Sequence, residues 1–239
     1  MEQRVALVTG STSGIGEAVA RRCAADGFHV VVHSGHTAEA GDRLAAELGG
    51  SYVQADLADA DQAAATVAVA LAELGRLDVL VNNAGTSRVV PHDDLAAADP
   101  QTWRDLLEVN LIAPWALTTV ATPYLREQRG CVVNITSHAG VVARGASVPY
   151  AAGKAALNHV TRLLAVALGP EVRVNAVAPG LVDTPLTAGW TEAQEAWRER
   201  APMRRAARPA DVAAAVADLV ASDYRTGEVL VLDGGLHLV

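Results

Sequence analysis

Short apolar runs alternate with longer amphipathic stretches along the whole chain. The apolar runs are rich in valine and isoleucine and show little two-residue alternation, which is typical of strands buried on both faces of a parallel sheet. They predict strands at Arg4–Thr9, His29–His33, Ser51–Ala55, Asp78–Asn82, Cys131–Thr136, Val172–Ala178 and Glu228–Asp233. The amphipathic stretches predict helices at Ile15–Asp26, Ala38–Leu48, Asp61–Leu74, Pro100–Leu125, Tyr150–Leu168 and Pro209–Ser222.

This alternation predicts an α/β fold of the Rossmann type. We expect a doubly wound parallel sheet of about seven strands, with helices on both faces and right-handed crossovers. The sequence contains no Pro-rich or Gly/Ser-rich linker and no repeat of fixed length, so we interpret residues 1–239 as a single domain. Residues 181–208 form a long stretch without a strand. In such a fold they would lie above the carboxyl ends of the strands, and we expect them to form a substrate lid.

The composition excludes several classes of protein. Of the 239 residues, 51% are hydrophobic and 19% are charged, which excludes a mainly disordered chain. The net charge of −8 argues against duplex nucleic acid or an anionic membrane as the main partner. No uninterrupted apolar run approaches the roughly 18 residues of a membrane helix. The first residues do not resemble a secretory signal, and Cys23 and Cys131 are too few for a disulfide framework. We therefore expect a cytoplasmic protein that binds neither nucleic acid nor membrane.

A glycine-rich turn connects the first predicted strand to the first helix. It reads Thr9-Gly10-Ser11-Thr12-Ser13-Gly14-Ile15-Gly16. Gly10 permits a sharp turn, and Gly14 and Gly16 permit close approach of a pyrophosphate and of the helix to the strand. Free N–H groups and the dipole at the start of the helix attract phosphate. The strand–turn–helix setting favours a dinucleotide site over a flexible loop without a ligand.

Tyr150 and Lys154 are spaced to lie on one face of a helix. A lysine ammonium one turn away favours the phenolate, so we predict that Lys154 lowers the pKa of Tyr150 and makes it a general acid or base. The alternative is an ordinary surface pair. Ser137 favours the catalytic interpretation, because it ends the strand Cys131–Thr136 at the same sheet edge as the glycine-rich turn. Its hydroxyl could hold a substrate oxygen.

Taken together, these motifs resemble those of the short-chain dehydrogenases/reductases, in particular the compact single-domain branch of 3-oxoacyl reductase-like ketoreductases. The resemblance covers essentially the whole chain. The matching residues occur in the family's order: Thr9–Gly16, Asp56, Asn82–Gly85, Asn110, Ser137, Tyr150, Lys154, Pro179, Gly180 and Thr184. Any one of these matches is weak evidence, but the ordered set is highly specific.

The resemblance implies a role for each matching residue. Asn110, Ser137, Tyr150 and Lys154 would be catalytic, with Asn110 holding a water that links Lys154 to solvent. Asp56 would bind the adenine, Lys154 the nicotinamide ribose, and Pro179 to Thr184 the carboxamide. The implied cofactor-binding residues are Gly10, Ser11, Thr12, Ser13, Gly14, Ile15, Gly16, Ser34, His36, Asp56, Leu57, Asn83, Ala84, Gly85, Tyr150, Lys154, Pro179, Gly180, Val182 and Thr184. The implied reaction is hydride transfer to a carbonyl, with Tyr150 donating the proton, or the reverse.

The end of the second strand bears on the choice of cofactor. An acidic residue there would bind the ribose 2′-hydroxyl of NAD and repel a 2′-phosphate. The sequence has Ser34 at the position of the family's acidic residue, and its hydroxyl could donate to a phosphate. Gly35 replaces the arginine common in NADP enzymes, and His36 could partly compensate. We therefore predict that NADP(H) is preferred and that NAD(H) is possible.

Several other features leave alternatives open. None of the seven histidines lies at metal-ligand spacing, so no metal site is predicted, and for His138 we favour a solvent-facing position over one in the substrate pocket. The arginines of segment 181–208 are interpreted as a solvated face. Alternatively, they bind an acidic substrate, such as a carboxylate or an acyl group on a carrier protein or coenzyme A. By resemblance, helices Pro100–Leu125 and Tyr150–Leu168 would pair subunits in a homodimer or homotetramer. The rival function is a catalytically silent NAD(P)-binding scaffold or redox sensor.

Overall fold

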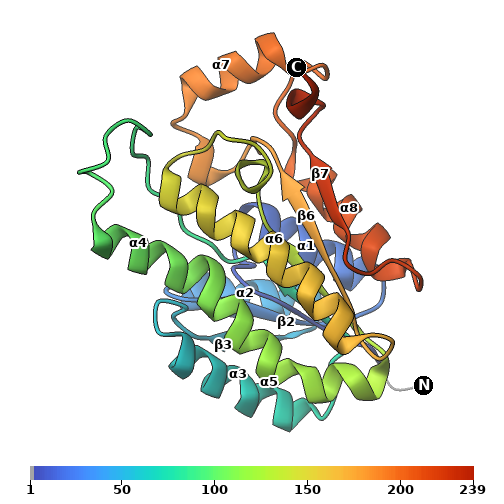
Figure 1. Ribbon diagram of the computed structural model, residues 1–239. Coiled ribbons are helices and arrows are strands. Elements are labelled where there is room, and N and C mark those ends of the chain that lie inside the picture. The colour runs from blue at the N-terminus through green and yellow to red at the C-terminus, as the bar shows by residue number, and fades with distance from the viewer. Residues whose placement is uncertain (1–2) are drawn as a thin grey trace.

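The computed structural model describes residues 3–239, and within them it shows a single parallel sheet (Figure 1). The strands are β1 (Val5–Val8), β2 (His29–Ser34), β3 (Ser51–Gln54), β4 (Val79–Asn82), β5 (Cys131–Ile135), β6 (Arg173–Pro179) and β7 (Val229–Leu232). Their order across the 7-stranded sheet is β3-β2-β1-β4-β5-β6-β7, and every neighbouring pair is parallel. The predicted doubly wound parallel sheet is confirmed.

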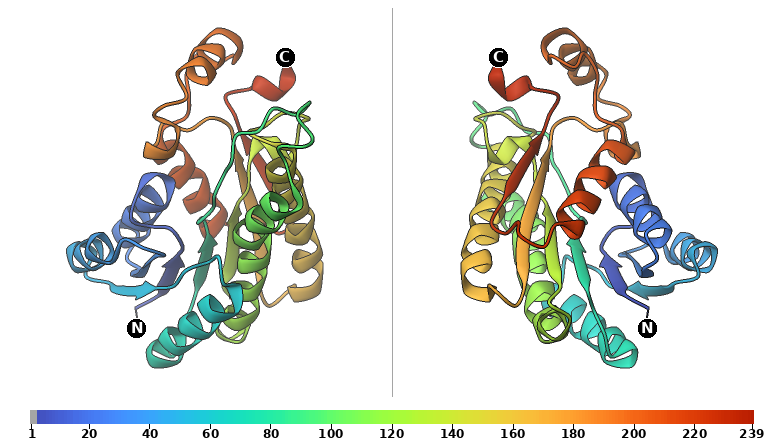
Figure 2. Two further views of the ribbon diagram at one scale, coloured as in Figure 1. Left: turned by 90° about the vertical axis from the view of Figure 1, so that its left-hand side faces the viewer. Right: turned by 90° about the vertical axis from the view of Figure 1, so that its right-hand side faces the viewer.

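Helices cover both faces of the sheet, as the side views show (Figure 2). Helices α1, α2 and α8 share one apolar cluster with the sheet, and helices α3, α5 and α6 share the other. The helices are α1 (Gly14–Ala25), α2 (Ala38–Leu48), α3 (Ala60–Leu74), α4 (Pro100–Leu107), α5 (Ala113–Gln128), α6 (Val148–Leu168), α7 (Thr191–Arg200) and α8 (Pro209–Ala221). Short 3-10 helices occur at η2 (His138–Gly140), η3 (Pro185–Thr187) and η4 (Leu236–Leu238).

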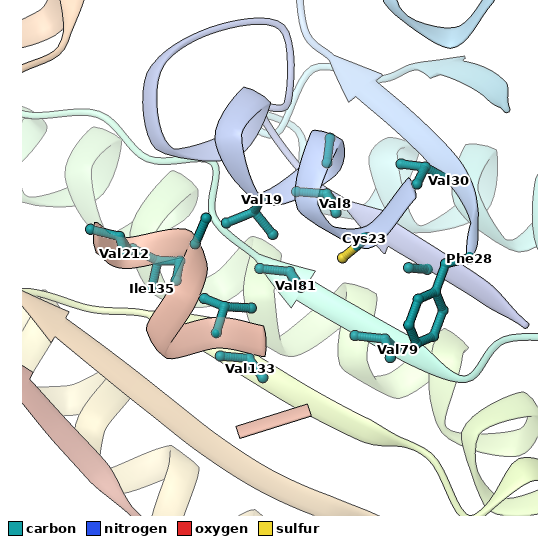
Figure 3. Close-up of a cluster of buried hydrophobic side chains, with 14 of the residues drawn as sticks. Val8, Val19, Cys23, Phe28, Val30, Val79, Val81, Val133, Ile135 and Val212 are labelled. Carbon is teal, nitrogen blue, oxygen red and sulfur yellow. The ribbon is translucent and has the colours of Figure 1, made fainter. Parts of the chain in front are cut away.

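The core lies between the sheet and the two helix layers. Figure 3 shows the first cluster, in which Val81 and Val133 of the sheet lie with Val19 of α1 and Val212 of α8. Leu80 belongs to the opposite cluster, as expected when successive side chains of a strand point to opposite faces. Both cysteines are buried and free.

The predicted helix Pro100–Leu125 is wrong as one continuous element. The structure divides it into α4, a π-helical turn η1 (Glu108–Ile112) and α5. Pro114 has no N–H to donate to the carbonyl of Asn110, four residues earlier, so a regular α-helical ladder cannot run through this point. Within this π-helical turn, the Asn110 side chain donates to the carbonyls of Leu106 and Thr86, at 2.8 Å each.

The carboxyl ends of the strands meet at one edge of the sheet. The strand order reverses between β1 and β4, and a crevice for ligands is expected outside such a switch point. Helix α7 stands above the carboxyl end of β6, and none of its residues is buried (Figure 1). Among residues 3–239, no helix combines the length and apolar character needed to cross a membrane.

Candidate functional site

Two neighbouring cavities follow the carboxyl edge of the sheet. The first, of about 690 Å³, is lined by Gly10, Asp56 and the face formed by α4 and η1. The second, of about 630 Å³, lies under segment 181–208 and is lined by Ser137, Tyr150, Lys154 and Trp197, among others. Gly85 and Thr86, just after β4, line both cavities. The two cavities therefore form one elongated site across the switch point, in the size range of cofactor and substrate pockets.

The glycine-rich turn after β1 is built for close backbone approach. Gly10 and Gly14 have φ of 60° and 56°, in the left-handed region that favours glycine. A Cβ on Gly16 would lie 2.2 Å from the carbonyl oxygen of Gly10. Ser13 is the N-cap of α1, but its side chain makes no capping hydrogen bond. The first N–H groups of α1 are therefore available to an anion at this helix end.

Hydrogen bonds fix the loop after β1 against the loop after β4. The Thr9 hydroxyl accepts from the N–H groups of Asn83 and Ala84, at 2.9 Å each. The Asn83 amide donates to the carbonyls of Thr9 and Gly10, at 2.8 and 3.2 Å. Asn83 lines the second cavity and Ala84 the first. The predicted neighbours of a dinucleotide are thus held rigidly at the centre of the site.

The outer end of the first cavity corrects one expectation about the cofactor. Gly35, His36, Asp56 and Leu57 line it, but Ser34 does not. Ser34 is 4% exposed, and its hydroxyl lies 2.8 Å from that of Tyr52. The expectation that Ser34 faces a 2′-phosphate is therefore wrong, because the side chain at this position packs against β3.

One hydroxyl near this end, that of Thr37, was missed by sequence reasoning. Thr37 lies just before α2, and its hydroxyl is 2.9 Å from that of Thr12 in the glycine-rich turn; Thr37 is exposed and Thr12 is half-buried. Nearby, the exposed His36 ring lies 3.6 Å from the Asp56 carboxylate. Thr12 and Thr37 lie in the loops after β1 and β2, which are far apart in the sequence. No local motif therefore indicates their contact, and only the parallel pairing of β1 with β2 could have predicted it.

Ser137, Tyr150 and Lys154 meet at the second cavity because two elements pack closely. Ser137 accepts from the Ala139 N–H at 3.1 Å and so caps η2. A Cβ on Gly140 would lie 2.7 Å from the backbone of Lys154, so only glycine lets η2 pack this closely on α6. The Ser147 hydroxyl accepts from the Tyr150 N–H at 3.4 Å and caps the start of α6.

Burial sets the electrostatics of this group. Lys154 is 4% exposed and donates to the Ile135 carbonyl at 3.0 Å, and burial lowers its pKa to about 8. Desolvation raises the pKa of Tyr150, and a hydrogen bond with Ser137 opposes this only in part. The prediction that Lys154 lowers the pKa of Tyr150 is therefore wrong for this structure. The lysine Nζ lies 5.9 Å from the centre of the tyrosine ring, and desolvation of the phenol dominates.

Asn110 lies near Lys154, and its side chain has one hydrogen-bond acceptor, Oδ1, without a partner in the part of the chain that the structure describes. Its side chain is buried, and its Oδ1 is among the buried polar atoms without a partner in the described residues. A Cβ on Gly85 would lie 2.8 Å from this oxygen and 3.5 Å from Lys154 Nζ, so both atoms flank the same glycine. The π-helical turn thus places Asn110 Oδ1, which has no hydrogen-bond partner among residues 3–239, close to Lys154 Nζ.

The residues after β6 form the roof of the second cavity. Pro179, Gly180, Val182 and Thr184 all line it. Thr184 also approaches the glycine-rich turn, because its Cγ2 would lie 3.2 Å from a Cβ on Gly14. The ring of Trp197 packs on Gly180, where a Cβ would lie only 2.3 Å from the indole. Trp197 therefore attaches the otherwise exposed α7 to the end of β6.

The position expected for His138 is also wrong. This side chain is 6% exposed, lines the second cavity and has its Nδ1 2.8 Å from the Asp233 carboxylate. Asp233 was not identified as a site residue, although it ends the predicted strand Glu228–Asp233 at the relevant sheet edge. Neither Asp233 nor the contact with His138 belongs to a local motif, because the two residues are 95 positions apart.

Charged groups around the segment 181–208 are partly paired. Arg205 and Arg208 contact Asp211 at 2.6 and 3.3 Å, and Arg204 donates to the Glu199 carbonyl. These contacts agree with the interpretation of a solvated face for these arginines. Arg144 is exposed and lines the second cavity. Among the described residues, no group of His, Cys, Asp or Glu could hold a metal ion.

Comparisons with known proteins agree with this geometry. The model of the family described as "Enoyl-(Acyl carrier protein) reductase" matches residues 10–237. The chain is 50% identical over 243 residues to "Granaticin polyketide synthase putative ketoacyl reductase 2" of Streptomyces violaceoruber, covering 100% of this chain and 98% of the relative. The fold and the sequence together define a nicotinamide-dependent oxidoreductase of the α/β class.

Solved structures extend the comparison to bound cofactors. A 3-ketoacyl-(acyl-carrier-protein) reductase from Brucella melitensis complexed with NADH has a TM-score of 0.89 and 32% identity, with 98% of each chain covered. A gluconate 5-dehydrogenase from Burkholderia cenocepacia in complex with NADP and tartrate has a TM-score of 0.91 and 29% identity, covering 100% of this chain and 97% of the other. The protein belongs to the short-chain dehydrogenase/reductase family and is an enzyme of that family.

Proposed function

We propose that the protein is an NADP(H)-dependent ketoreductase that uses Tyr150 as the general acid, or as the base in the reverse direction. The observation that carries this proposal is the convergence of Ser137, Tyr150 and Lys154 in one cavity, continuous with the glycine-rich turn. A catalytically silent scaffold would need the turn but not a proton donor beside it. The intact donor group therefore favours turnover over the rival function.

The residues present fit a dinucleotide. The N–H groups at the start of α1 would hold the pyrophosphate, and Asp56 with Leu57 would hold the adenine end. Lys154 would bind the ribose hydroxyls, while Pro179, Gly180, Val182 and Thr184 would hold the carboxamide. When bound in reduced form, the nicotinamide supplies the hydride that reduces the substrate carbonyl.

The proton would come from Tyr150. The raised pKa of this phenol keeps it protonated at neutral pH, which suits a donor to the developing alkoxide. Ser137 would hold the carbonyl oxygen against the phenol by a hydrogen bond of its own. With its pKa lowered to about 8, Lys154 could return a proton toward Tyr150. Asn110 Oδ1, which is free in the structure, would accept a hydrogen bond from a water that connects Lys154 to solvent.

The preference for NADP(H) rests on charge at the end of β2. His33, Gly35 and His36, at the end of β2 and just after it, line the first cavity, so no carboxylate from this part of the chain opposes a 2′-phosphate. The hydroxyls of Thr12 and Thr37, which lie near this end, offer additional donors. Related structures were solved with NADH and with NADP, so both nucleotides belong in the test.

The substrate would be a carbonyl compound bound under the lid formed by residues 181–208. Leu181, Leu186 and Leu236 supply apolar walls, and Arg144 at the edge of the cavity could contact an acidic group. A small ketone and an acyl chain carried on a thioester both suit this arrangement, and the named relatives include ketoacyl reductases.

We also propose that two or four copies associate through the helices on the α5 and α6 side. Ile112 and Trp115 near the start of α5 are 44% and 52% exposed. Leu163 and Val166 on α6 are 56% and 85% exposed. Apolar side chains of this size on neighbouring helices are typical of a surface that is covered in a dimer or tetramer.

The decisive test is a substrate panel followed at the absorbance of the reduced cofactor. We expect NADPH-dependent reduction of ketones or 3-oxoacyl thioesters, and slower reduction with NADH. A 2-enoyl thioester serves as the control, because the matched family description names enoyl reduction. Turnover of the enoyl compound alone would contradict carbonyl reduction. Cofactor binding without turnover of any carbonyl substrate would favour the silent scaffold.

A further inference from the structure

One polar side chain in the second cavity has no role in the mechanism above. His138 follows Ser137 directly and begins η2, and it is 6% exposed. Its Nε2 is buried and has no hydrogen-bond partner among the described residues. Such atoms are uncommon in folded proteins and each requires an explanation. Since His138 also lines the cavity, a ligand in that cavity is a natural partner.

The contact with Asp233 determines which nitrogen carries the proton. His138 Nδ1 lies 2.8 Å from Asp233 Oδ2. Burial alone would raise the pKa of Asp233, but hydrogen bonds from His237, His138 and the Gly235 N–H outweigh it and hold the pKa below its usual value. The carboxylate is therefore ionised and can only accept, so Nδ1 must donate. In the neutral form of the ring, Nε2 carries the lone pair and is an acceptor.

The orientation of the ring is fixed from two sides. Asp233, which follows β7, holds Nδ1 and is itself held by the His237 N–H at 2.8 Å and the Gly235 N–H at 2.9 Å. Trp197 of α7 meets the ring edge-on, with centroids 5.6 Å apart and an interplanar angle of 71°. The indole is held in turn by its packing on Gly180. The imidazole is thus preorganised by elements from three parts of the chain.

We propose that His138 is a specificity-determining residue whose Nε2 accepts a hydrogen bond from a hydroxyl group of the substrate. Ser137 and His138 are adjacent in the chain and line the same cavity, so we infer that this hydroxyl lies within a few bonds of the carbonyl that Ser137 would hold. The natural substrate is accordingly a hydroxyketone or a hydroxylated oxoacyl compound. The inference rests on the proposed function, because it takes the carbonyl position from Ser137 and Tyr150.

The same geometry explains why a plain ketone would be a poorer substrate. The Nε2 acceptor is already shielded from solvent and unpaired among the described residues, so an alkyl group gives it no partner, whereas a substrate hydroxyl would pair with it. Sites built around a substrate hydroxyl reject analogues that lack it for this reason. From the strength of one neutral hydrogen bond we expect a discrimination of about tenfold.

The experiment compares a β-hydroxyketone with the matched ketone that carries a methyl group in place of the hydroxyl. The wild type should prefer the hydroxyketone about tenfold in kcat/KM. His138→Asn keeps a donor toward Asp233 but lacks an atom at the Nε2 position, so the ratio should fall to about one. His138→Gln places an amide oxygen closer to that position and should restore part of the ratio. His237→Asn is the matched control, because His237 contacts Asp233 but is exposed and does not line the cavity.

A second readout separates this inference from the proposed function. Binding of the corresponding diol and of its methyl analogue to the NADP⁺-loaded protein is measured by calorimetry, which needs no turnover. The ratio of Kd values should follow the same pattern across the variants. If neither ketone is reduced, the proposed function fails, and the Kd ratio still decides the role of His138.

Three outcomes would overturn the inference. One is an unchanged ratio in His138→Asn. Another is an equal loss of the ratio in His138→Asn and His237→Asn, which would indicate a structural effect through Asp233. The third is a preference for a β-carboxylate analogue over the hydroxyketone, because a carboxylate requires Nε2 to donate rather than accept.

Discussion

The two ends of the elongated site are held in different ways. At the glycine-rich turn, the contacts converge on backbone carbonyls: Gly16 packs on the carbonyl of Gly10, and the Asn83 side-chain amide donates to the carbonyls of Thr9 and Gly10. At the opposite end, side chains bring remote segments together, as Trp197 does on Gly180. The first arrangement leaves little freedom for change, whereas the second can be altered by single side chains.

This difference suits the two ends to different ligands. The backbone-built end suits a ligand that does not vary, because a dinucleotide presents the same pyrophosphate whatever the substrate is. The end under segment 181–208 suits a variable substrate, because helix α7 contributes no buried residue and its position depends on a few contacts. Substitutions at the two ends should therefore have effects of different size and kind.

The largest effect on nucleotide binding is expected at Gly16. In Gly16→Val the added carbons would enter the space of the Gly10 carbonyl, so the turn must open. Overpacking of this kind costs on the order of 1–3 kcal/mol, and we expect NADPH affinity to fall by about a hundredfold. Fluorescence titration measures the Kd, and circular dichroism checks that the fold is retained. An affinity equal to wild type would contradict the assignment of the phosphate site.

The next effect concerns the choice of nucleotide. In Gly35→Asp a carboxylate would enter the first cavity, where the nearest atoms to a new Cβ are 3.8 Å away, so the side chain has room. It should repel a 2′-phosphate and bind the ribose hydroxyl of NAD. We expect the ratio of kcat/KM values to shift toward NADH by at least about tenfold. Gly35→Ala is the uncharged control, and an equal shift in both variants would exclude a charge effect.

A pH profile should distinguish the titration of Lys154 from that of Tyr150 in the second cavity. Burial lowers the pKa of Lys154 to about 8, while desolvation raises that of Tyr150 above its usual value. Reduction requires the protonated forms, so kcat/KM should decline as pH rises through about 8, by about tenfold per pH unit above it. In Lys154→Arg this decline should move to higher pH, because arginine stays protonated. A first decline near pH 10 in the wild type would contradict this assignment.

A smaller effect is expected at the lid. Trp197→Ala removes the indole that joins α7 to Gly180 and to His138. The lid should close less completely, raising KM about fivefold to tenfold while NADPH affinity stays near wild type. Trp197→Phe is the control, since it keeps an aromatic ring. A loss of NADPH affinity as large as the change in KM would show that the two ends are not independent.

The same contrast explains what could be predicted from the sequence. The parallel sheet and the glycine-rich turn follow from short apolar runs and from local glycine spacing, and the predicted sheet is confirmed. The sequence also predicts one edge of the sheet for Ser137, from the end of its strand, and one helix face for Tyr150 and Lys154, from their spacing. The prediction failed where a residue depends on distant partners, as with Ser34 against Tyr52 and His138 against Asp233.

Two further predictions, the continuous helix around Asn110 and the lowered pKa of Tyr150, failed because residue spacing gives no information on missing backbone donors or on burial. Apolar periodicity continues through η1, so the turn around Asn110 was read as helix, and only the missing N–H of Pro114 signals the interruption. For Tyr150, the spacing to Lys154 predicts an electrostatic influence, but it contains no information on burial. Desolvation of the phenol follows from the packing of the whole cavity.

The central claim is that Tyr150 donates the proton in a carbonyl reduction, and Tyr150→Phe tests it most directly. The ring and its packing are kept, while the proton is removed. We expect kcat to fall by about a thousandfold, in the range typical of a lost general acid, with the Kd for NADPH within about twofold of wild type. Turnover of the variant at the parent rate would contradict the account.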